Sequence, residues 1–200
     1  MLQHHMRPTC PTCLRAKITC ICHLVSSVPT DVEVLILQHP LEVLETKGTA
    51  RLLHLCLPNS SVLTGEVFKE SQLLSTKNTI LLYPITPEDH SLGIISPPEL
   101  NKTSLIDLKN IRLIIIDGTW RKSRKILCKN PHLQTLPRLV LDNLPGGQYT
   151  IRKARKPHQL STLEATTAAL AQLENDVVKF APLDQSFLAF NAMLSKQMNR

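Results

Sequence analysis

The chain has 200 residues, of which 42% are hydrophobic and 20% are charged, as expected for a globular domain with a substantial core. No apolar run approaches the roughly 20 residues of a membrane helix. The N-terminus lacks the apolar core of a signal peptide, so we expect a cytoplasmic protein without a membrane partner. The net charge of +7 favours a polyanionic partner. Because only 4% of the residues are aromatic, a folded RNA matches better than a single strand stacked on exposed rings.

Four cysteines are clustered near the N-terminus as one Cys-x2-Cys pair and one Cys-x-Cys pair: Cys10, Cys13, Cys20 and Cys22. Four thiolates at this spacing can bind a tetrahedral zinc ion and leave no open position for catalysis. We therefore predict a structural zinc site in residues 1–25, with His23 as a conceivable substitute ligand. The alternatives are a flexible cysteine-rich arm and redox chemistry at Cys10 and Cys13. Cys56 and Cys128 lie in helical patterns and are expected to be small buried residues.

Short apolar runs alternate with amphipathic segments in the rest of the chain. The apolar runs predict strands at 32–37, 61–64, 79–83, 113–117 and 138–142. The amphipathic segments predict helices at 49–57, 119–129, 165–174 and 184–197. This alternation predicts an α/β domain with a mostly parallel sheet, which we assign to residues 26–200.

Several local features refine this outline. Thr49 and Ser161 are predicted helix N-caps, and Glu164 completes a capping box with Ser161. His39 and Glu42 are expected to bond to the backbone or to each other rather than to form an acid–base pair. The proline-rich stretch 85–110 is predicted to be irregular. The last helix is expected to bury Phe187, Leu188, Met193 and Leu194.

The predicted strand 113–117 ends in the sequence Asp-Gly-Thr-Trp at 117–120. Asp117 is therefore expected at the carboxyl end of a central strand, where open α/β sheets bind their ligands. The alternative interpretation is that Asp117 caps the following helix. A phosphatase-type aspartate nucleophile is excluded, because Ile115 occupies the position that would carry it.

The pattern Arg-Lys-x-Arg-Lys occurs twice, and both copies are candidate RNA contacts: Arg121, Lys122, Arg124, Lys125, Arg152, Lys153, Arg155 and Lys156. The alternative for each copy is a solvated basic face. A turn is predicted between the copies at 143–148.

Several motifs together resemble the DTW-domain family, the tRNA-uridine aminocarboxypropyltransferases. Asp117-Gly-Thr-Trp120 matches the family signature. The other matching motifs are the cysteine pairs, Gln38-His-Pro-x-Glu42, Gly48-Thr49-Ala, Leu82-Tyr-Pro84, Asn130-Pro131 with Leu136-Pro-Arg138, Tyr149-x-Ile-Arg152 and Ser161-Thr-Leu-Glu-Ala165. Their order and spacing make the resemblance specific.

The resemblance implies a SPOUT-like fold whose C-terminal part is a trefoil knot that binds S-adenosylmethionine. It also implies a reaction: transfer of the 3-amino-3-carboxypropyl group to N3 of a tRNA uridine in the variable loop, with release of methylthioadenosine. We expect Asp117 to act as general base, with Thr119 and Trp120 shaping the site; core packing is the alternative for Trp120. An ordinary aspartate is a weak base, so this role requires a suitable environment.

The donor contacts are predicted at the ends of strands and at the start of the helix after Leu160: Leu82, Tyr83, Pro84, Leu141, Leu144, Tyr149, Ile151, Ser161, Thr162 and Glu164. Two other functions remain open at this point. A SPOUT-type RNA methyltransferase would use the same donor but transfer its methyl group. A non-catalytic zinc-containing RNA-binding module would need no donor pocket.

Overall fold

A computed structural model of the chain describes residues 8–86, 91, 93–141 and 160–198. Within these residues, five strands form one sheet in the order β2-β1-β4-β3-β5. The strands are β1 (Glu33–Gln38), β2 (Ser60–Thr64), β3 (Asn78–Leu82), β4 (Ile111–Asp117) and β5 (Arg138–Leu139). All four pairings between them are parallel. The prediction of a mostly parallel α/β sheet is therefore confirmed.

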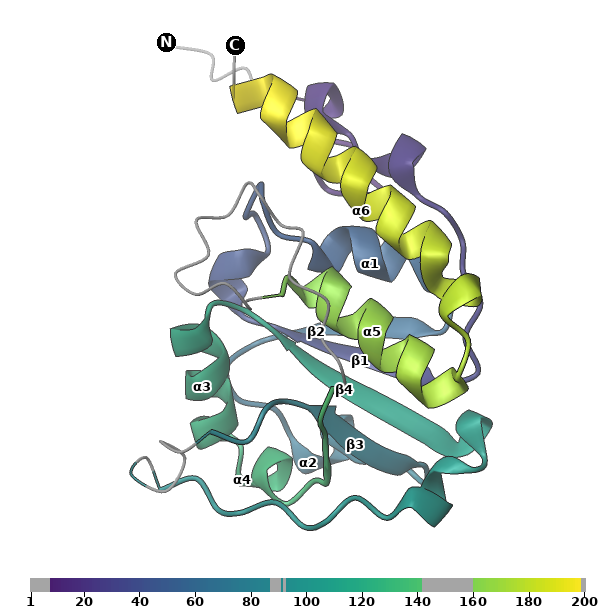
Figure 1. The fold of residues 1–200 in the computed structure, drawn as a ribbon. Coiled ribbons are helices and arrows are strands. Elements are labelled where there is room, and N and C mark those ends of the chain that lie inside the picture. The colour runs from purple at the N-terminus through teal and green to yellow at the C-terminus, as the bar shows by residue number, and fades with distance from the viewer. Residues whose placement is uncertain (1–7, 87–90, 92, 142–159, 199–200) are drawn as a thin grey trace, which may run out of the picture.

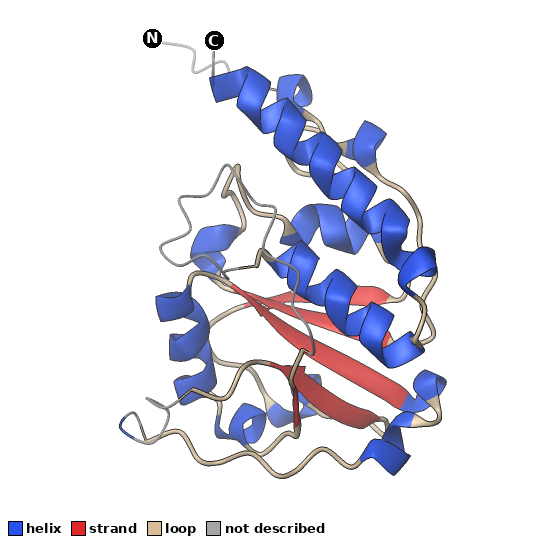
Figure 2. Cartoon of the chain, viewed as in Figure 1, coloured by secondary structure: helices blue, strands red, loops and turns tan. Residues whose placement is uncertain are grey.

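Helices cover both faces of the sheet, as Figure 1 shows. On one face lie α1 (Ala50–Cys56), α5 (Thr162–Glu174) and α6 (Val177–Met198). On the other lie α2 (Glu70–Leu73), α3 (Trp120–Lys129) and α4 (Pro131–Gln134). Figure 2 shows the strands as one layer between these two groups. Among the described helices, none has both the length and the apolarity needed to span a membrane.

Strand β4 is buried on both sides, which explains its nearly continuous apolar sequence. Leu113 and Ile115 belong to the apolar cluster that includes α1, α5 and α6. Ile114 belongs to a second cluster, which includes α2, α3 and α4. Because successive side chains of a strand alternate between its faces, one apolar run supplies two cores.

The register of the sheet sets up the site. Gln38, the last residue of β1, lies opposite Asp117, the last residue of β4. Both strands therefore end at the same edge and place two polar side chains next to each other. The His39 N–H continues this pairing by donating to the Asp117 carbonyl at 3.0 Å.

Two predicted elements have different bounds in the structure. The last helix begins at Val177, not at 184, and runs through Pro182. Its start is fixed by Asp176, whose carboxylate accepts from the Lys179 N–H at 2.9 Å, an N-cap that the proline obscures in the sequence. Strand β5 ends at Leu139; residues 140 and 141 of the predicted strand are not strand, and residue 142 lies outside the described residues.

Two burial predictions were wrong. Leu188 is half exposed, although Phe187 and Leu194 of the same helix are buried as predicted and Met193 is partly buried. Cys128 is exposed, because α3 turns Ile126 and Leu127 inward and leaves the next position facing solvent. Cys56 is buried as predicted.

Candidate active site

Asp117 is buried, with 5% of its surface exposed, and its carboxylate is held by two side chains. Oδ2 accepts a hydrogen bond from Gln38 Nε2 at 3.0 Å. Oδ1 accepts one from Thr162 Oγ1 at 2.7 Å. The donors come from β1 and from the first turn of α5, so the carboxylate is fixed between three elements that are far apart in the sequence. Thr162, which was predicted as a donor contact, donates to Asp117 and lines the cavity beside it.

The interpretation of Asp117 as a helix N-cap is wrong. Thr119 is the N-cap of α3, and its hydroxyl accepts from the Lys122 N–H at 3.4 Å. Gly118 lies between Asp117 and the N-cap Thr119. A Cβ at position 118 would lie 3.1 Å from Lys122 Cβ and 3.5 Å from Ser123 N. A residue without a side chain at 118 thus lets the first turn of α3 approach the end of β4.

The start of α5 is fixed by the predicted capping box. Ser161 Oγ accepts from the Glu164 N–H at 3.2 Å, and the Glu164 carboxylate accepts from the Ser161 N–H at 2.7 Å. Thr49 has no side-chain capping bond in its own helix; instead its hydroxyl accepts from the Leu163 N–H at 3.2 Å. These bonds satisfy backbone donors that a helix start leaves free and hold Thr162 next to Asp117.

A cavity of about 250 Å³ lies beside Asp117. Its walls come from the loop after β1, the start of α3 and the start of α5. The residues that line it are Glu42, Glu45, Lys47, Gly48, Thr49, Asp117, Gly118, Thr119, Lys122, Ser161 and Thr162. The cavity therefore combines carboxylates, ammonium groups and hydroxyls, which suits a small polar ligand.

The loop after β1 is attached to α3 by charged groups. Glu42, in the short helix η3 (Pro40–Glu42), forms an ion pair with Lys122 at 2.7 Å. His39 is 3% exposed, and its Nδ1 accepts from the Leu41 N–H at 3.2 Å. Nε2 of His39 therefore carries the proton that it shares with Glu66 Oε1 at 2.9 Å. His39 thus bonds to the backbone as predicted, whereas the partner of Glu42 is Lys122.

Glu66 neutralises much of the basic surface of α3. Its carboxylate also pairs with Lys125 and Lys129, each at 2.7 Å. These hydrogen bonds, first from Lys125 and then from Lys129, lower the pKa of Glu66 to about 2. Among the candidate RNA contacts on α3, Lys122 and Lys125 are thus engaged by acids, and Arg121 is exposed.

Trp120 packs against the residue that follows β3. Its ring meets the Tyr83 ring edge-on, with centroids 5.7 Å apart and an interplanar angle of 87°. Arg138 lies 5.5 Å from the same Tyr83 ring and donates to the Pro84 carbonyl at 3.1 Å. Because Trp120 is 44% exposed, it is not a core residue. It borders the site on the β3 side and is not among the described residues that line the Asp117 cavity.

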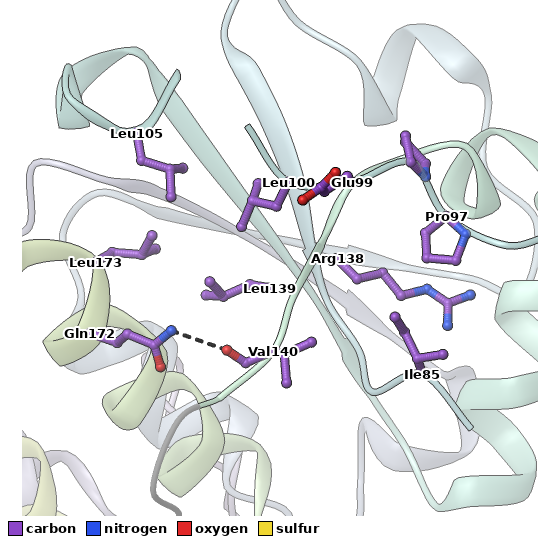
Figure 3. Close-up of a pocket in the computed structure, with 11 residues that line it drawn as sticks. Ile85, Pro97, Glu99, Leu100, Leu105, Arg138, Leu139, Val140, Gln172 and Leu173 are labelled. Carbon is purple, nitrogen blue, oxygen red and sulfur yellow. Dashed lines mark hydrogen bonds between the residues drawn. The ribbon is translucent and has the colours of Figure 1, made fainter. Parts of the chain in front are cut away.

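A second cavity, of about 570 Å³, lies along β5 (Figure 3). Its lining is largely apolar: Ile85, Pro97, Pro98, Leu100, Leu105, Leu139, Val140 and Leu173, with Glu99, Arg138 and Gln172. Gln172 Nε2 donates to the Val140 carbonyl at 3.1 Å and closes one side. The predicted donor segment Leu82–Pro84 is followed directly by Ile85, which lines this cavity. Leu141, another predicted donor contact, follows its wall residue Val140.

Seven predicted site residues lie outside the described residues: Leu144, Tyr149, Ile151, Arg152, Lys153, Arg155 and Lys156. The predicted turn at 143–148 lies there too. The structure brings together Asp117, Thr119, Ser161 and Thr162 around one cavity. The sequence prediction missed the role of Gln38, although it belongs to the quoted Gln-His-Pro motif, and it missed Lys47 and Glu66, which belong to none of the quoted motifs.

The four N-terminal cysteines form a group that could hold a metal ion. All four Sγ atoms lie within 4.8 Å of one another. Cys10 and Cys22 are 3.7 Å apart, and Cys13 and Cys20 are 3.8 Å apart. Backbone hydrogen bonds from Cys13 and Thr12 lower the pKa of Cys10 to about 6, which favours its thiolate. Among the described residues this group consists of the cysteines, without His23.

The cysteine segment is attached to the rest of the chain rather than extended from it. Cys13 and Ile21 are buried in the same cluster as α5 and α6. The Arg15 guanidinium lies 5.5 Å from the ring centroid of Phe190 in α6. It also donates to the Thr46 carbonyl at 2.9 Å, in the loop that lines the Asp117 cavity.

The fold and the site thus define a class of protein. It is a parallel α/β domain with a buried aspartate at the carboxyl edge of its sheet and a potential four-cysteine metal site. The model of the DTW domain matches residues 7–198, and the chain belongs to this family. It is 31% identical over 182 residues to tRNA-uridine aminocarboxypropyltransferase 2 of Macaca fascicularis, covering 85% of this chain and 58% of that protein. It is 30% identical over 186 residues to the Drosophila melanogaster protein of the same name, covering 84% of this chain and 68% of that protein. No solved structure matches the chain.

A plant relative is more distant. The chain is 28% identical over 136 residues to tRNA-uridine aminocarboxypropyltransferase A of Arabidopsis thaliana, covering 62% of this chain and 52% of that protein. The chain thus spans little more than half the length of several curated relatives that it matches.

Proposed function

We propose that this protein transfers the 3-amino-3-carboxypropyl group of S-adenosylmethionine to N3 of a tRNA uridine. The observation that carries the proposal is the position of Asp117: the motif aspartate is buried at the carboxyl edge of the sheet, beside a polar cavity. The names of these relatives, which all describe tRNA-uridine aminocarboxypropyltransferases, support the same reaction. A variable-loop uridine is the proposed target.

Asp117 would act on the N3–H of the uracil. As the Asp117 carboxylate accepts this proton, the nitrogen forms a bond to the γ-carbon of the methionine chain, and the bond between that carbon and sulfur breaks. The electron pair of the broken bond remains on sulfur, so the sulfonium becomes the neutral thioether of methylthioadenosine. Gln38 and Thr162 hold the carboxylate in one orientation at the edge of the cavity.

We assign the donor to the edge formed by β3, β4 and β5. Leu82, Tyr83, Pro84 and Leu141 lie at this edge, and Ser161 and Glu164 fix the start of α5 next to it. The strand order is compatible with a SPOUT-like fold, and a trefoil knot in the C-terminal part of the chain is part of this proposal. Leu144, Tyr149 and Ile151 stay predicted donor contacts.

The cysteine group is proposed to bind a structural zinc. Four Sγ atoms within 4.8 Å of one another match a tetrahedral thiolate site, and the pairwise 3.7 and 3.8 Å separations fit ligands around one ion. Zinc would cross-link the segment and leave the chemistry to the carboxyl edge. On this view residues 1–25 are a metal-binding appendage of a catalytic domain at 26–200.

The tRNA contacts are proposed on the basic groups beside the site. Arg121 of α3 is the favoured candidate in the first cluster, because it is exposed while Lys122 and Lys125 are partly neutralised by Glu42 and Glu66. Arg124 stays a predicted contact. The second cluster, Arg152, Lys153, Arg155 and Lys156, stays a predicted contact.

The decisive experiment is mass spectrometry of nucleosides from unmodified tRNA incubated with the protein and S-adenosylmethionine. We expect aminocarboxypropyl-uridine together with methylthioadenosine. A methylated base with S-adenosylhomocysteine would assign the protein to the RNA methyltransferases instead. Absence of any product despite tight tRNA binding would favour a binding module.

The role of Asp117 is tested by the Asp117→Asn variant in the same assay. An amide of the same shape cannot accept the N3 proton, so product formation should fall by at least about a thousandfold, within the range attributed to general bases and their positioning. Affinity for the donor should stay close to that of the wild type. An active Asn variant would show that Asp117 only orients its neighbours.

A further inference from the structure

The Asp117 cavity has charged groups of both signs in its wall. Besides Asp117, two lysines, Lys47 and Lys122, and two glutamates, Glu42 and Glu45, line it. A cavity built only for a neutral pyrimidine would gain nothing from such a wall, since desolvating charges is costly unless the ligand pairs with them. The wall therefore indicates a ligand group that carries both charges.

The charges near Asp117 are divided between two places. Lys122 and Glu42 form an ion pair at 2.7 Å and neutralise each other on the α3 side. Lys47 and Glu45 lie on the loop side of the cavity. The loop side of the wall thus carries one basic and one acidic residue.

The loop that carries these two residues is held in a tight turn. The Gly48 N–H donates to the Glu45 carbonyl at 3.0 Å, and the Lys47 N–H donates to Glu45 Oε1 at 3.3 Å. A Cβ at Gly48 would lie 3.2 Å from the Glu45 carbonyl oxygen, so glycine permits the closure. Arg15 fixes the same turn from outside by donating to the Thr46 carbonyl at 2.9 Å.

We infer that this cavity binds the amino acid end of the donor, with Lys47 pairing with its α-carboxylate and Glu45 with its α-ammonium. The inference rests on the proposed function: the transferred group is a zwitterion, and its γ-carbon must reach the nitrogen that Asp117 deprotonates. Its other end must then lie in the same cavity. At about 250 Å³ the cavity is below the usual range for a complete drug-sized ligand, so the adenosine lies outside it.

This placement explains which carbon of the sulfonium reacts. A sulfonium donor offers three carbons to a nucleophile, and the one held nearest the nitrogen is attacked. Anchoring the amino acid end beside Asp117 brings the γ-carbon to N3 and turns the methyl group away. Lys47 and Glu45 are thus specificity-determining residues that favour aminocarboxypropyl transfer over methyl transfer.

The test is calorimetry with two compounds that differ in the amino acid end. S-adenosylmethionine carries it, and methylthioadenosine lacks it. In Lys47→Met, which keeps the length of the side chain but not its charge, affinity for S-adenosylmethionine should fall about tenfold or more, as for the loss of a charge-assisted hydrogen bond. Affinity for methylthioadenosine should be unchanged. Glu45→Gln should show the same pattern with a smaller loss, because Glu45 is exposed.

Two controls make the result specific. Lys109→Met removes an exposed ammonium group next to the opposite end of β4 and should bind both compounds like the wild type. Decarboxylated S-adenosylmethionine should bind the wild type about tenfold more weakly than the intact donor, and Lys47→Met should no longer distinguish the two. Equal losses for both compounds, or no loss at all, would overturn the inference. Product formation by the wild type separates that outcome from failure of the proposed function, in which neither product nor donor binding is seen.

Discussion

The Asp117 carboxylate depends on two long-range hydrogen bonds, from Gln38 and Thr162. Because each of its oxygens accepts a hydrogen bond, the carboxylate cannot rotate freely and keeps a fixed direction. A base gains rate from such fixed geometry, because misplacement by about 1 Å can cost about a hundredfold. Gln38 is therefore a positioning residue for the proposed proton transfer.

Replacing Gln38 by Met should reduce the turnover number by roughly tenfold to a hundredfold, since the carboxylate would lose the hydrogen bond from Gln38. The KM for S-adenosylmethionine should change by less than about threefold, because Gln38 does not line the cavity. Steady-state kinetics at saturating tRNA would measure both quantities.

Gln38→Asn is the matched variant, with the same amide on a shorter side chain, and should recover part of the lost rate. A purely structural role for Gln38 predicts something else: lower thermal stability and a raised KM in Gln38→Met, with no recovery in Gln38→Asn.

At the scale of the elements, the sequence was most informative where a single segment determines its own structure. Strand β4 has two buried faces, so its apolar run identified it, and the Ser161–Glu164 capping box identified the start of α5. Pro182 obscured the true start of α6, because the N-cap bond that precedes it lies on the other side of an apparent helix breaker. Asp117 and Thr119 are both good N-caps, and only the structure shows which residue caps α3.

The position of the candidate site was predicted from the sequence, but the contacts within it were not. The carboxyl edge of the sheet follows from the alternation of strands and helices, and Asp117 was placed there correctly. The hydrogen bonds of Asp117 to Gln38 and Thr162 were not predicted, because they depend on the order of strands in the sheet. The same holds for the ion pairs between Glu66 and α3, which join segments about 60 residues apart in the sequence.

The basic face of α3 should become more basic when Glu66 loses its charge. Glu66→Gln keeps an acceptor for His39 but removes the carboxylate that engages Lys125 and Lys129. If α3 contacts tRNA, the variant should bind tRNA more tightly, and the slope of log affinity against log salt should steepen by about one to two. Filter binding at several salt concentrations measures this slope.

The matched control is Glu70→Gln, which removes a nearby exposed carboxylate paired with His132 rather than with a lysine. It changes the net charge equally and should leave the slope almost unchanged. Equal effects of the two variants would mean that only the net charge matters, and no effect of either would place the tRNA on another surface. Since the pKa of Glu66 is lowered to about 2, its ion pairs should persist at mildly acidic pH and be lost only as the pH falls toward that value.

At the scale of the whole molecule, the cysteine segment is connected to the active-site loop. Arg15 lies between Cys13 and Cys20 in the sequence, and it bonds to the Thr46 carbonyl and packs on Phe190. Arg51 of α1 donates to the Thr12 carbonyl in the same segment. A metal ion that fixes the cysteines would therefore also fix Arg15 and, through it, the turn that carries Lys47.

Removing the metal should accordingly destabilise the fold and loosen this turn. Several kcal/mol of metal-binding free energy would be lost, and each kcal/mol corresponds to about 2–4 °C for a chain of this size, so a strong chelator should lower the Tm by roughly 10 °C. Hydrogen exchange followed by mass spectrometry should show faster exchange at 43–48, where the Glu45 and Gly48 N–H groups are hydrogen-bonded in the intact turn. Arg15→Met should give the faster exchange at 43–48 with the metal still bound, because it breaks the connection without removing a ligand. Unchanged exchange in both cases would mean that contacts other than those of Arg15 hold the loop, among them its own hydrogen bonds and the ion pair of Glu42 with Lys122.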